Sequence, residues 1–469
     1  MHSSPGSDAA RSTGKDHRYH SVMSGPPVLK SGGLLGHTRA FADDPLGMFS
    51  LLLETFPNEE VVRIRFGPFM DYAVTGAEAA RQLMLGGHDH LVRPWFFNRV
   101  FKEMSGLNLF TANGEEWSWR RKMIGPAFHS AEIAGMADTM VSIAERVARN
   151  WHVGDRIDLT EEMTSLTLEV AGQALFGVDV RADDRGRRLA LAFEGMIQWT
   201  NYRVERFFSE PVWAPTARAA RARRAIGVVG SIAAEAVAER RAQGGEHHDL
   251  LQLLLDSRDA ETGEPLGDLE VVSEAKAFFF AGHETTSSAL SWAWLELARH
   301  PDIANALREE LTRVLDGRSP ELSDLEDLDL TRRIVEESLR LHPPAMVLTR
   351  RTHGAVEAGG YRIPRNRGIL VLIYAIHRNP KYWDAPHTFD PDRFTPNRSR
   401  GRPAHAFLPF GEGPRMCVGS RFAMTEACLI LATLAQRWRF EVEEPTEVKP
   451  DTRFVLKPAR LSATVLGGL

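Results

Sequence analysis

The amino-acid sequence predicts one mainly α-helical domain with small antiparallel β-sheets. A continuous helical pattern covers residues 269–299, and most of residues 131–245 also carry apolar side chains at helical spacing. Short β-type segments occur outside this helical region. After the N-terminus, no linker rich in proline or serine divides the 469 residues, which favours one large unit over two domains.

Composition narrows the class of protein. Hydrophobic residues make up 43% of the chain, and the formal net charge of −5 argues against a nucleic-acid partner. The two cysteines, Cys417 and Cys428, fit a reducing cytoplasm better than a disulfide scaffold. No segment reaches the roughly 18 apolar residues of a membrane span. We therefore expect a cytoplasmic monomer without a membrane anchor, with a disordered tail at residues 1–24 and one domain over residues 25–469.

The N-terminal part predicts short elements. Residues 45–54 form a helical pattern, residues 61–66 and 72–75 form two strands of a hairpin, and residues 77–85 form a second helix. Residues 92–110 are rich in aromatic side chains without a clean period, so we expect a loop with some helix.

A helix is predicted around Trp117 and Arg121, which lie four residues apart and therefore share one helix face. A stacked Trp and Arg pair on the surface is the alternative interpretation. Arg120 and Lys122 point elsewhere on this helix, and we expect them to contribute to a basic face that suits an acidic partner.

The helix over residues 269–299 is apolar on all sides and then abruptly polar at its centre. A helix that is apolar all round is buried. Burial of Glu284 and Thr285 costs free energy unless each finds a partner, which indicates chemistry at this point. Gly282 lowers the free-energy cost of opening the helix locally, so that a Thr hydroxyl can leave the helical hydrogen-bond ladder and face a ligand. A hydroxyl cluster that only bends the helix is the alternative.

The C-terminal part predicts strands at residues 347–350, 360–364 and 368–373, a hairpin tip at residues 454–456 and a helix from residue 420 to 436. Cys417 lies in a loop with Gly411, Gly413 and Gly419, directly before that last helix. A helix N-terminus stabilises negative charge, so this position is expected to lower the thiol pKa. A metal ligand, a nucleophile and a structural thiol all remain open from this pattern alone. Cys428 falls on the apolar face of the helix and is expected to be core.

The longer string from Phe410 to Gly419, F-G-E-G-P-R-M-C-V-G, resembles the haem-binding signature of the cytochrome P-450 family. The string A-G-H-E-T-T at residues 281–286 resembles the oxygen-binding motif of the same family. The resemblance extends over nearly the whole chain from about Pro26. It implies the cytochrome P-450 fold, with Cys417 as the axial thiolate of haem iron.

The resemblance also implies roles for individual residues. Thr285 would lie next to bound dioxygen, and Glu284 would lie on the path by which protons reach it. Haem b would be held without a covalent bond, because Ala281 stands where members with covalently attached haem have Glu. The remaining expected cofactor contacts are Trp117, Arg121, Arg350, Arg415, Phe410, Gly411, Ala281 and Gly419. A buried charge network is expected from Glu337, Arg340 and Arg393. The expected substrate pocket consists of Trp95, Phe96, Phe193, Ile197, Phe280, Ala345, Met346, Val347, Phe454 and Val455.

The function that follows is a haem-thiolate monooxygenase acting with dioxygen on a lipophilic terpenoid, polyketide, steroid or fatty acyl compound. The chain has no flavin, nicotinamide or iron-sulfur motif, so electrons are expected from a separate ferredoxin and its reductase. An arginine-rich composition suggests a GC-rich bacterial genome and secondary metabolism. A peroxide-driven or isomerising haem-thiolate enzyme is one alternative, and a non-catalytic haem-binding sensor is another.

Overall fold

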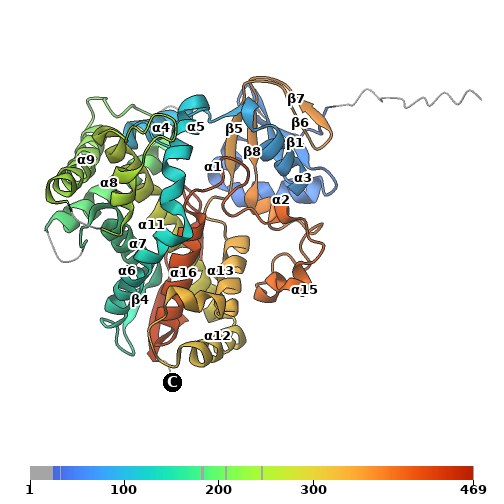
Figure 1. The fold of residues 1–469 in the computed structure, drawn as a ribbon. Coiled ribbons are helices and arrows are strands. Elements are labelled where there is room, and N and C mark those ends of the chain that lie inside the picture. Colours follow the sequence, from blue (N-terminus) through green and yellow to red (C-terminus); the bar gives the residue numbers. More distant parts are fainter. Residues whose placement is uncertain (1–24, 32, 181–183, 206–208, 245–246, 468–469) are drawn as a thin grey trace, which may run out of the picture.

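The computed structural model describes residues 25–31, 33–180, 184–205, 209–244 and 247–467. A helical part, built mainly from α4 to α13 and α16, lies beside a smaller part that contains the largest β-sheet with α1 to α3 (Figure 1). The predicted tail at residues 1–24 lies outside the described residues. Among the described residues, no helix combines the length and the apolar character needed to cross a membrane.

The helices account for most of the fold. In chain order they are α1 Thr38–Asp43, α2 Pro45–Thr55, α3 Ala77–Arg81, α4 Trp95–Ser105, α5 Gly114–Ile124, α6 Ser130–Ala148, α7 Leu159–Phe176, α8 Asp184–Glu205, α9 Ala217–Gln243, α10 Leu250–Asp256, α11 Asp268–Arg299, α12 Pro301–Leu315, α13 Asp329–Leu341, α14 Ile373–Ile376, α15 Pro396–Ser399 and α16 Ser420–Ala435. The aromatic segment at residues 92–110, expected to be a loop with some helix, contains the three-turn helix α4.

The strands are short. They are β1 Val61–Phe66, β2 Phe69–Val74, β3 Leu91–Val92, β4 Arg156–Asp158, β5 Leu348–Thr352, β6 Val356–Ala358, β7 Tyr361–Ile363, β8 Gly368–Val371, β9 Trp438–Val442, β10 Pro450–Asp451, β11 Lys457–Pro458 and β12 Ser462–Gly467.

The largest sheet has the order β1-β2-β8-β5-β3, and the remaining strands form β4-β12-β9, β6-β7 and β10-β11. The pairings are antiparallel with one exception, because β2 and β8 run parallel with Tyr72 opposite Ile369. Parallel pairing requires a crossover connection, which here passes through most of the helical part. The sheet thereby joins the N-terminal strands to residues 348–371.

Helix α11 is the central element of the helical part. Its N-terminus is capped by the Glu270 carboxylate, which accepts the Gly267 backbone N–H at 3.0 Å. Pro301 follows the helix directly, which explains the end at Arg299. Helix α11 packs against α7, α9, α13 and α16, so its middle turns are buried, as the apolar pattern predicts.

Candidate active site

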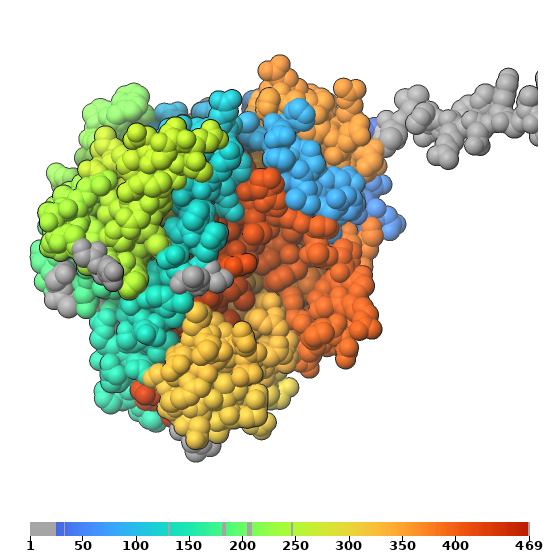
Figure 2. Space-filling model, in the orientation of Figure 1, coloured from blue at the N-terminus to red at the C-terminus, as the bar shows by residue number. Residues whose placement is uncertain are grey.

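The loop before α16 presents Cys417 to the interior of the protein. Gly411 and Gly413 adopt φ values of +70° and +72°, which side chains other than glycine rarely adopt. At Gly413 a Cβ atom would lie 2.2 Å from the Met84 carbonyl oxygen, so the loop also depends on close backbone contact. The Cys417 N–H donates to the Phe410 carbonyl at 2.9 Å and closes the turn. Figure 2 shows this red-orange part of the chain between a blue and a teal segment.

The electrostatics of Cys417 differ from the expectation. Burial raises the pKa of the thiol, and the Gly419 backbone N–H and the Arg121 charge lower it by less. The Cys417 side chain is exposed, but it is exposed to a cavity that the protein surrounds. The prediction that the helix N-terminus makes the free thiol ionise readily was therefore wrong, because desolvation outweighs it. A coordinated metal ion deprotonates such a thiol outright.

A cavity of about 330 Å³ extends from Cys417 to α11. One wall carries Cys417, Phe410, Gly411 and Gly419, and the opposite side carries Ala281 and Thr285. The expected cofactor contacts that line this cavity are Trp117, Arg121, Ala281, Arg350, Phe410, Gly411, Arg415 and Gly419. All eight residues predicted from the sequence to touch a cofactor thus meet around one space, although they come from four separate parts of the chain.

The cavity contains several arginines without an acidic partner. Arg415 lies 4.3 Å from the Trp117 ring and donates to the Ala112 carbonyl at 3.2 Å. Arg350 donates to the Thr349 carbonyl at 2.9 Å. Burial lowers the pKa of Arg350 to about 10, and burial together with the Arg350 charge lowers that of Arg415 to about 10. These guanidinium groups therefore favour an anion in the cavity.

Arg93 belongs to the same group and was missed from the sequence. It lines the cavity, and burial together with the charges of Arg350 and Arg415 lowers its pKa. Its Nε atom has no hydrogen-bond partner among the described residues. In the described part of the chain, Arg93, Arg121, Arg350 and Arg415 form no ion pair with Asp or Glu. Four such cations fit a cofactor with two carboxylates and a cysteine thiolate beside it.

Arg120 does not belong to a basic surface, so that prediction was wrong. Its side chain is 3% exposed and donates to Glu274 at 2.8 Å, to Glu116 at 2.7 Å and to Glu270 at 3.1 Å. Glu274 also accepts the Leu109 N–H at 3.0 Å. This network fastens α5 to α11. It therefore holds the helix that carries Trp117 and Arg121 in place over the cavity.

The polar turn of α11 keeps its helical hydrogen bonds. The Thr285 hydroxyl donates to the Ala281 carbonyl at 2.9 Å and lines the cavity. Helix α11 is continuous through Gly282. The predicted local opening of the helix is thus not present, because back-bonding to the carbonyl four residues earlier satisfies the hydroxyl without it.

Glu284 is not among the residues that line the cavity, and it has a cationic partner that the sequence did not reveal. Lys457, in β11, donates to its carboxylate at 3.2 Å. His283 lies 3.8 Å from the same carboxylate, which is an ion-pair distance but too long for a hydrogen bond. Burial raises the pKa of the Glu284 carboxyl, but His283 and Lys457 outweigh it and lower the pKa to about 2.

Glu337, Arg340 and Arg393 form one buried network. Arg340 donates twice to the Glu337 carboxylate, both at 2.7 Å, and Arg393 donates to it at 3.2 Å. Arg340 also donates to the His377 carbonyl at 2.8 Å. His377 Nε2 in turn accepts the Leu408 N–H at 2.7 Å. The network therefore connects α13 to the segment that leads into the cysteine loop.

The residues predicted to contact substrate lie in different surroundings. Ala345 lines the cavity. Phe280 lies 5.7 Å from Phe193 and 5.1 Å from Phe454, measured between ring centroids. Trp95 and Phe96 are 58% and 43% exposed. Ile197 is half-buried and Val455 is buried. Met346 and Val347 pack beside the largest sheet. Substrate contact by these residues stays a prediction.

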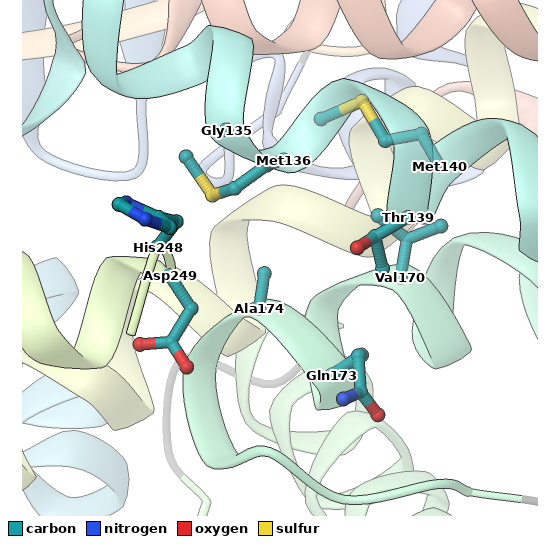
Figure 3. Close-up of a pocket in the computed structure, with 9 residues that line it drawn as sticks. All are labelled: Gly135, Met136, Thr139, Met140, Val170, Gln173, Ala174, His248 and Asp249. Carbon is teal, nitrogen blue, oxygen red and sulfur yellow. The ribbon is translucent and has the colours of Figure 1, made fainter. Parts of the chain in front are cut away.

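A second, smaller cavity of about 240 Å³ lies between α6, α7 and the start of α10. Figure 3 shows His248 and Asp249 on one side of this cavity and Val170 on the other, with Ala174 between them. Ala174 also lines the large cavity. Asp249 is engaged in an ion pair with Arg240 at 2.6 Å.

The fold and the arginine-lined cavity over a cysteine define a haem-thiolate class of protein, and comparison with known proteins agrees. The sequence model named Cytochrome P450 matches residues 26–465. The chain therefore belongs to the cytochrome P450 family. It is an oxidoreductase that incorporates oxygen into a lipophilic small molecule, as members of this family do. Membership implies a haem-thiolate centre, dioxygen as oxidant and a source of electrons.

Three matches illustrate the similarity. The chain is 34% identical to the Cyclooctat-9-en-7-ol 5-monooxygenase of Streptomyces melanosporofaciens, over 87% of each chain. It is 31% identical to the Pentalenene oxygenase of Streptomyces avermitilis, over 89% of this chain and 91% of that one. The solved structure entitled "Crystal structure of cytochrome P450DA heme domain" superposes with a TM-score of 0.86, at 26% identity, and covers 96% of this chain and 99% of that chain.

Proposed function

We propose that this protein is a monooxygenase with noncovalent haem b, in which Cys417 is the axial ligand of the iron. The observation that carries this proposal is the cavity itself, which holds Cys417 on one side and Thr285 on the other. When bound, the haem supplies dioxygen binding and reductive O–O cleavage. We further propose that residues 25–469 act as one haem domain.

The residues of the chain divide the remaining tasks between them. Arg93, Arg121, Arg350 and Arg415 hold the propionates, with Trp117 stacked against Arg415. Phe410 and the loop glycines shape the wall around Cys417. The Thr285 hydroxyl faces the space where dioxygen would lie and can hold a proton there. Glu284 directly precedes Thr285, and its ion pair with Lys457 stabilises the negative charge of its carboxylate.

The proposed substrate is a terpenoid hydrocarbon or alcohol. The large cavity is lined mainly by apolar side chains such as Leu109, Phe110, Ala277 and Leu348. Its arginines are the expected partners of the haem propionates, so they leave no cation for a substrate carboxylate. Two of the relatives are named for the terpenoids cyclooctat-9-en-7-ol and pentalenene. Secondary metabolism is the corresponding context, and cytoplasmic localisation stays a prediction from cysteine use.

We propose a ferredoxin with its reductase as the electron source. The sequence contains no flavin, nicotinamide or iron-sulfur motif that would let the chain take electrons directly from a nicotinamide cofactor. Lys122, with a side chain that is 72% exposed, lies on the surface with Glu261 at 4.0 Å, and an acidic partner would compete with that carboxylate; Arg120 is buried among carboxylates and does not reach the surface.

The spectrum of the reduced carbon monoxide complex tests the haem assignment. Wild-type protein should give the red-shifted Soret band of thiolate-ligated haem. Cys417→Ser should retain some haem and lose this band, because an alcohol is a far weaker donor than a thiolate. Cys428→Ser is the matched control, because that side chain is 4% exposed and belongs to the core of α16. A Cys417→Ser protein with an unchanged band would refute the assignment.

Two alternatives have distinct outcomes. Full turnover with hydrogen peroxide alone, unchanged by Thr285→Ala, would indicate a peroxide-driven enzyme. A wild-type spectrum without the thiolate band would favour a haem sensor over either enzyme. Addition of pentalenene tests the substrate class, because displacement of water from the haem by an apolar ligand shifts the spin state.

A further inference from the structure

The turn between α4 and α5, residues 106–113, forms part of the cavity wall. Leu109 and Phe110 of this turn line the cavity. The turn closes on itself through Asn108, which is fully buried and whose side-chain oxygen accepts the Phe110 and Thr111 N–H groups, both at 3.1 Å. Internal hydrogen bonds therefore fix the shape of this wall, and its position depends on what holds the turn from outside.

Glu274 on α11 holds the middle of this turn. Its side chain is fully buried, and both carboxylate oxygens accept the Leu109 N–H at 3.0 Å. Beside this contact the turn lies directly on α11, since a Cβ atom on Gly106 would lie 2.6 Å from the Ser273 Oγ atom. Glu274 is not among the residues that line the cavity. It therefore acts on the cavity wall through the Leu109 backbone and not by direct contact.

The C-terminal end of the turn has separate anchors. The Ala112 carbonyl accepts a hydrogen bond from Arg415 at 3.2 Å. The Asn113 side-chain oxygen accepts the Arg93 backbone N–H at 3.1 Å. Loss of the Glu274 contact should thus release the centre of the turn and leave its end attached to the segments that carry the cavity arginines.

The position of α5 does not depend on Glu274 alone. Arg120 also donates to Glu116 at 2.7 Å and to Glu270 at 3.1 Å, so it keeps two carboxylates when Glu274 is replaced. One oxygen of Glu274, Oε1, accepts both the Arg120 and the Leu109 donors. A glutamine oxygen in the same place can accept both. A hydrocarbon side chain can accept neither, and it leaves the Leu109 N–H buried without its acceptor.

We propose that Glu274 is a positioning residue for the substrate. By holding the Leu109 N–H, it fixes Leu109 and Phe110 as the apolar wall that orients the substrate. This inference rests on the proposed monooxygenase function, in which one bond of the substrate must face the reacting oxygen. An apolar substrate makes few hydrogen bonds, so its orientation depends on a rigid wall. A mobile wall has to be ordered on binding, and this ordering lowers affinity.

Imidazole ligands of haem test the wall without a known substrate. Imidazole coordinates the iron alone, whereas 4-phenylimidazole adds an apolar ring that extends into the cavity, and both shift the Soret band. The ratio of their dissociation constants therefore reports the wall and cancels general effects on the haem. Glu274→Leu should weaken 4-phenylimidazole relative to imidazole roughly tenfold, because two side chains must then be ordered on binding. Glu274→Gln should keep the ratio within about twofold of wild type, since its oxygen replaces the lost acceptor.

Glu310→Leu is the matched control. Glu310 is also a buried carboxylate that accepts backbone N–H groups, from Leu330 at 2.6 Å and Thr331 at 2.8 Å. It is not among the residues that line the cavity. This variant should lose stability and keep the wild-type ratio. Gly106→Ala is an independent variant, and it should change the ratio in the same direction as Glu274→Leu, because the new Cβ atom pushes the turn off Ser273.

Three results would overturn the proposal: an unchanged ratio in Glu274→Leu, an equal loss in Glu274→Gln, or an equal loss in Glu310→Leu. If Glu274→Leu fails to bind haem, an unchanged ratio in Gly106→Ala overturns it equally. Failure of the proposed function is recognised separately, because wild-type protein would then lack the thiolate band of its carbon monoxide complex.

Discussion

Replacement of Lys457 should show how strongly the ionised state of Glu284 depends on this cationic partner. The Glu284 side chain is 6% exposed and that of Lys457 is 22% exposed. The lowering of the Glu284 pKa from 4.5 to about 2 corresponds to roughly 3 kcal/mol in favour of the ionised form. His283 shares this stabilisation. Lys457→Met should therefore reduce the free energy of unfolding by about 1–2 kcal/mol at pH 7.

A double-mutant cycle isolates the pair. Glu284→Gln, Lys457→Met and the double variant are unfolded with urea in the same excess of haem, so that bound cofactor contributes equally. The coupling free energy should be about 1–2 kcal/mol, since removing both partners costs less than the sum of the single changes. Lys457→Arg is the control and should retain most of the stability.

The pH dependence has a definite sign. A carboxyl group with a lowered pKa in the folded state stabilises the protein above its ordinary pKa, and this stabilisation is lost as the pH falls toward the lowered value. For Glu284 that window extends from 4.5 down to about 2. The advantage of wild type over Lys457→Met should narrow through this window. A coupling below about 0.5 kcal/mol, or a difference that does not change with pH, would refute the reasoning.

Three further predictions concern the scaffold and the cofactor. Glu337→Ala should lower the free energy of unfolding by about 3–5 kcal/mol, because it leaves the guanidinium of Arg340 buried without its acid; urea titration checks this, and a loss below 1 kcal/mol would contradict it. Gly413→Ala should abolish haem loading, since its Cβ atom would lie 2.2 Å from a carbonyl oxygen at a φ of +72°, whereas Gly227→Ala, with open space around the new atom, should load haem normally. Arg93→Met should speed haem transfer to apomyoglobin roughly tenfold, equivalent to about 1.4 kcal/mol of lost binding, and an unchanged rate would show that Arg93 does not hold the cofactor.

Much of the fold was predictable because it depends on local signals. The apolar pattern of α11, the glycines of the cysteine loop and the proline after α11 act over one or two turns of chain. Helix α4 was harder, because its aromatic side chains pack on several neighbours and hide the helical period. The parallel pairing of β2 with β8 joins residues almost 300 positions apart, and no local pattern encodes it.

The sequence by itself determined the family, the cysteine and the residue types expected around a haem. Only the tertiary structure decided the charge environment, because pKa values depend on burial and on neighbours from distant elements. It placed Lys457 against Glu284, brought Arg93 to the other cavity arginines and buried Arg120 among carboxylates. It also turned Glu426, an ordinary position in an apolar helix by sequence, toward the cavity. Desolvation and long-range contacts are properties of the folded chain, so sequence spacing could not supply them.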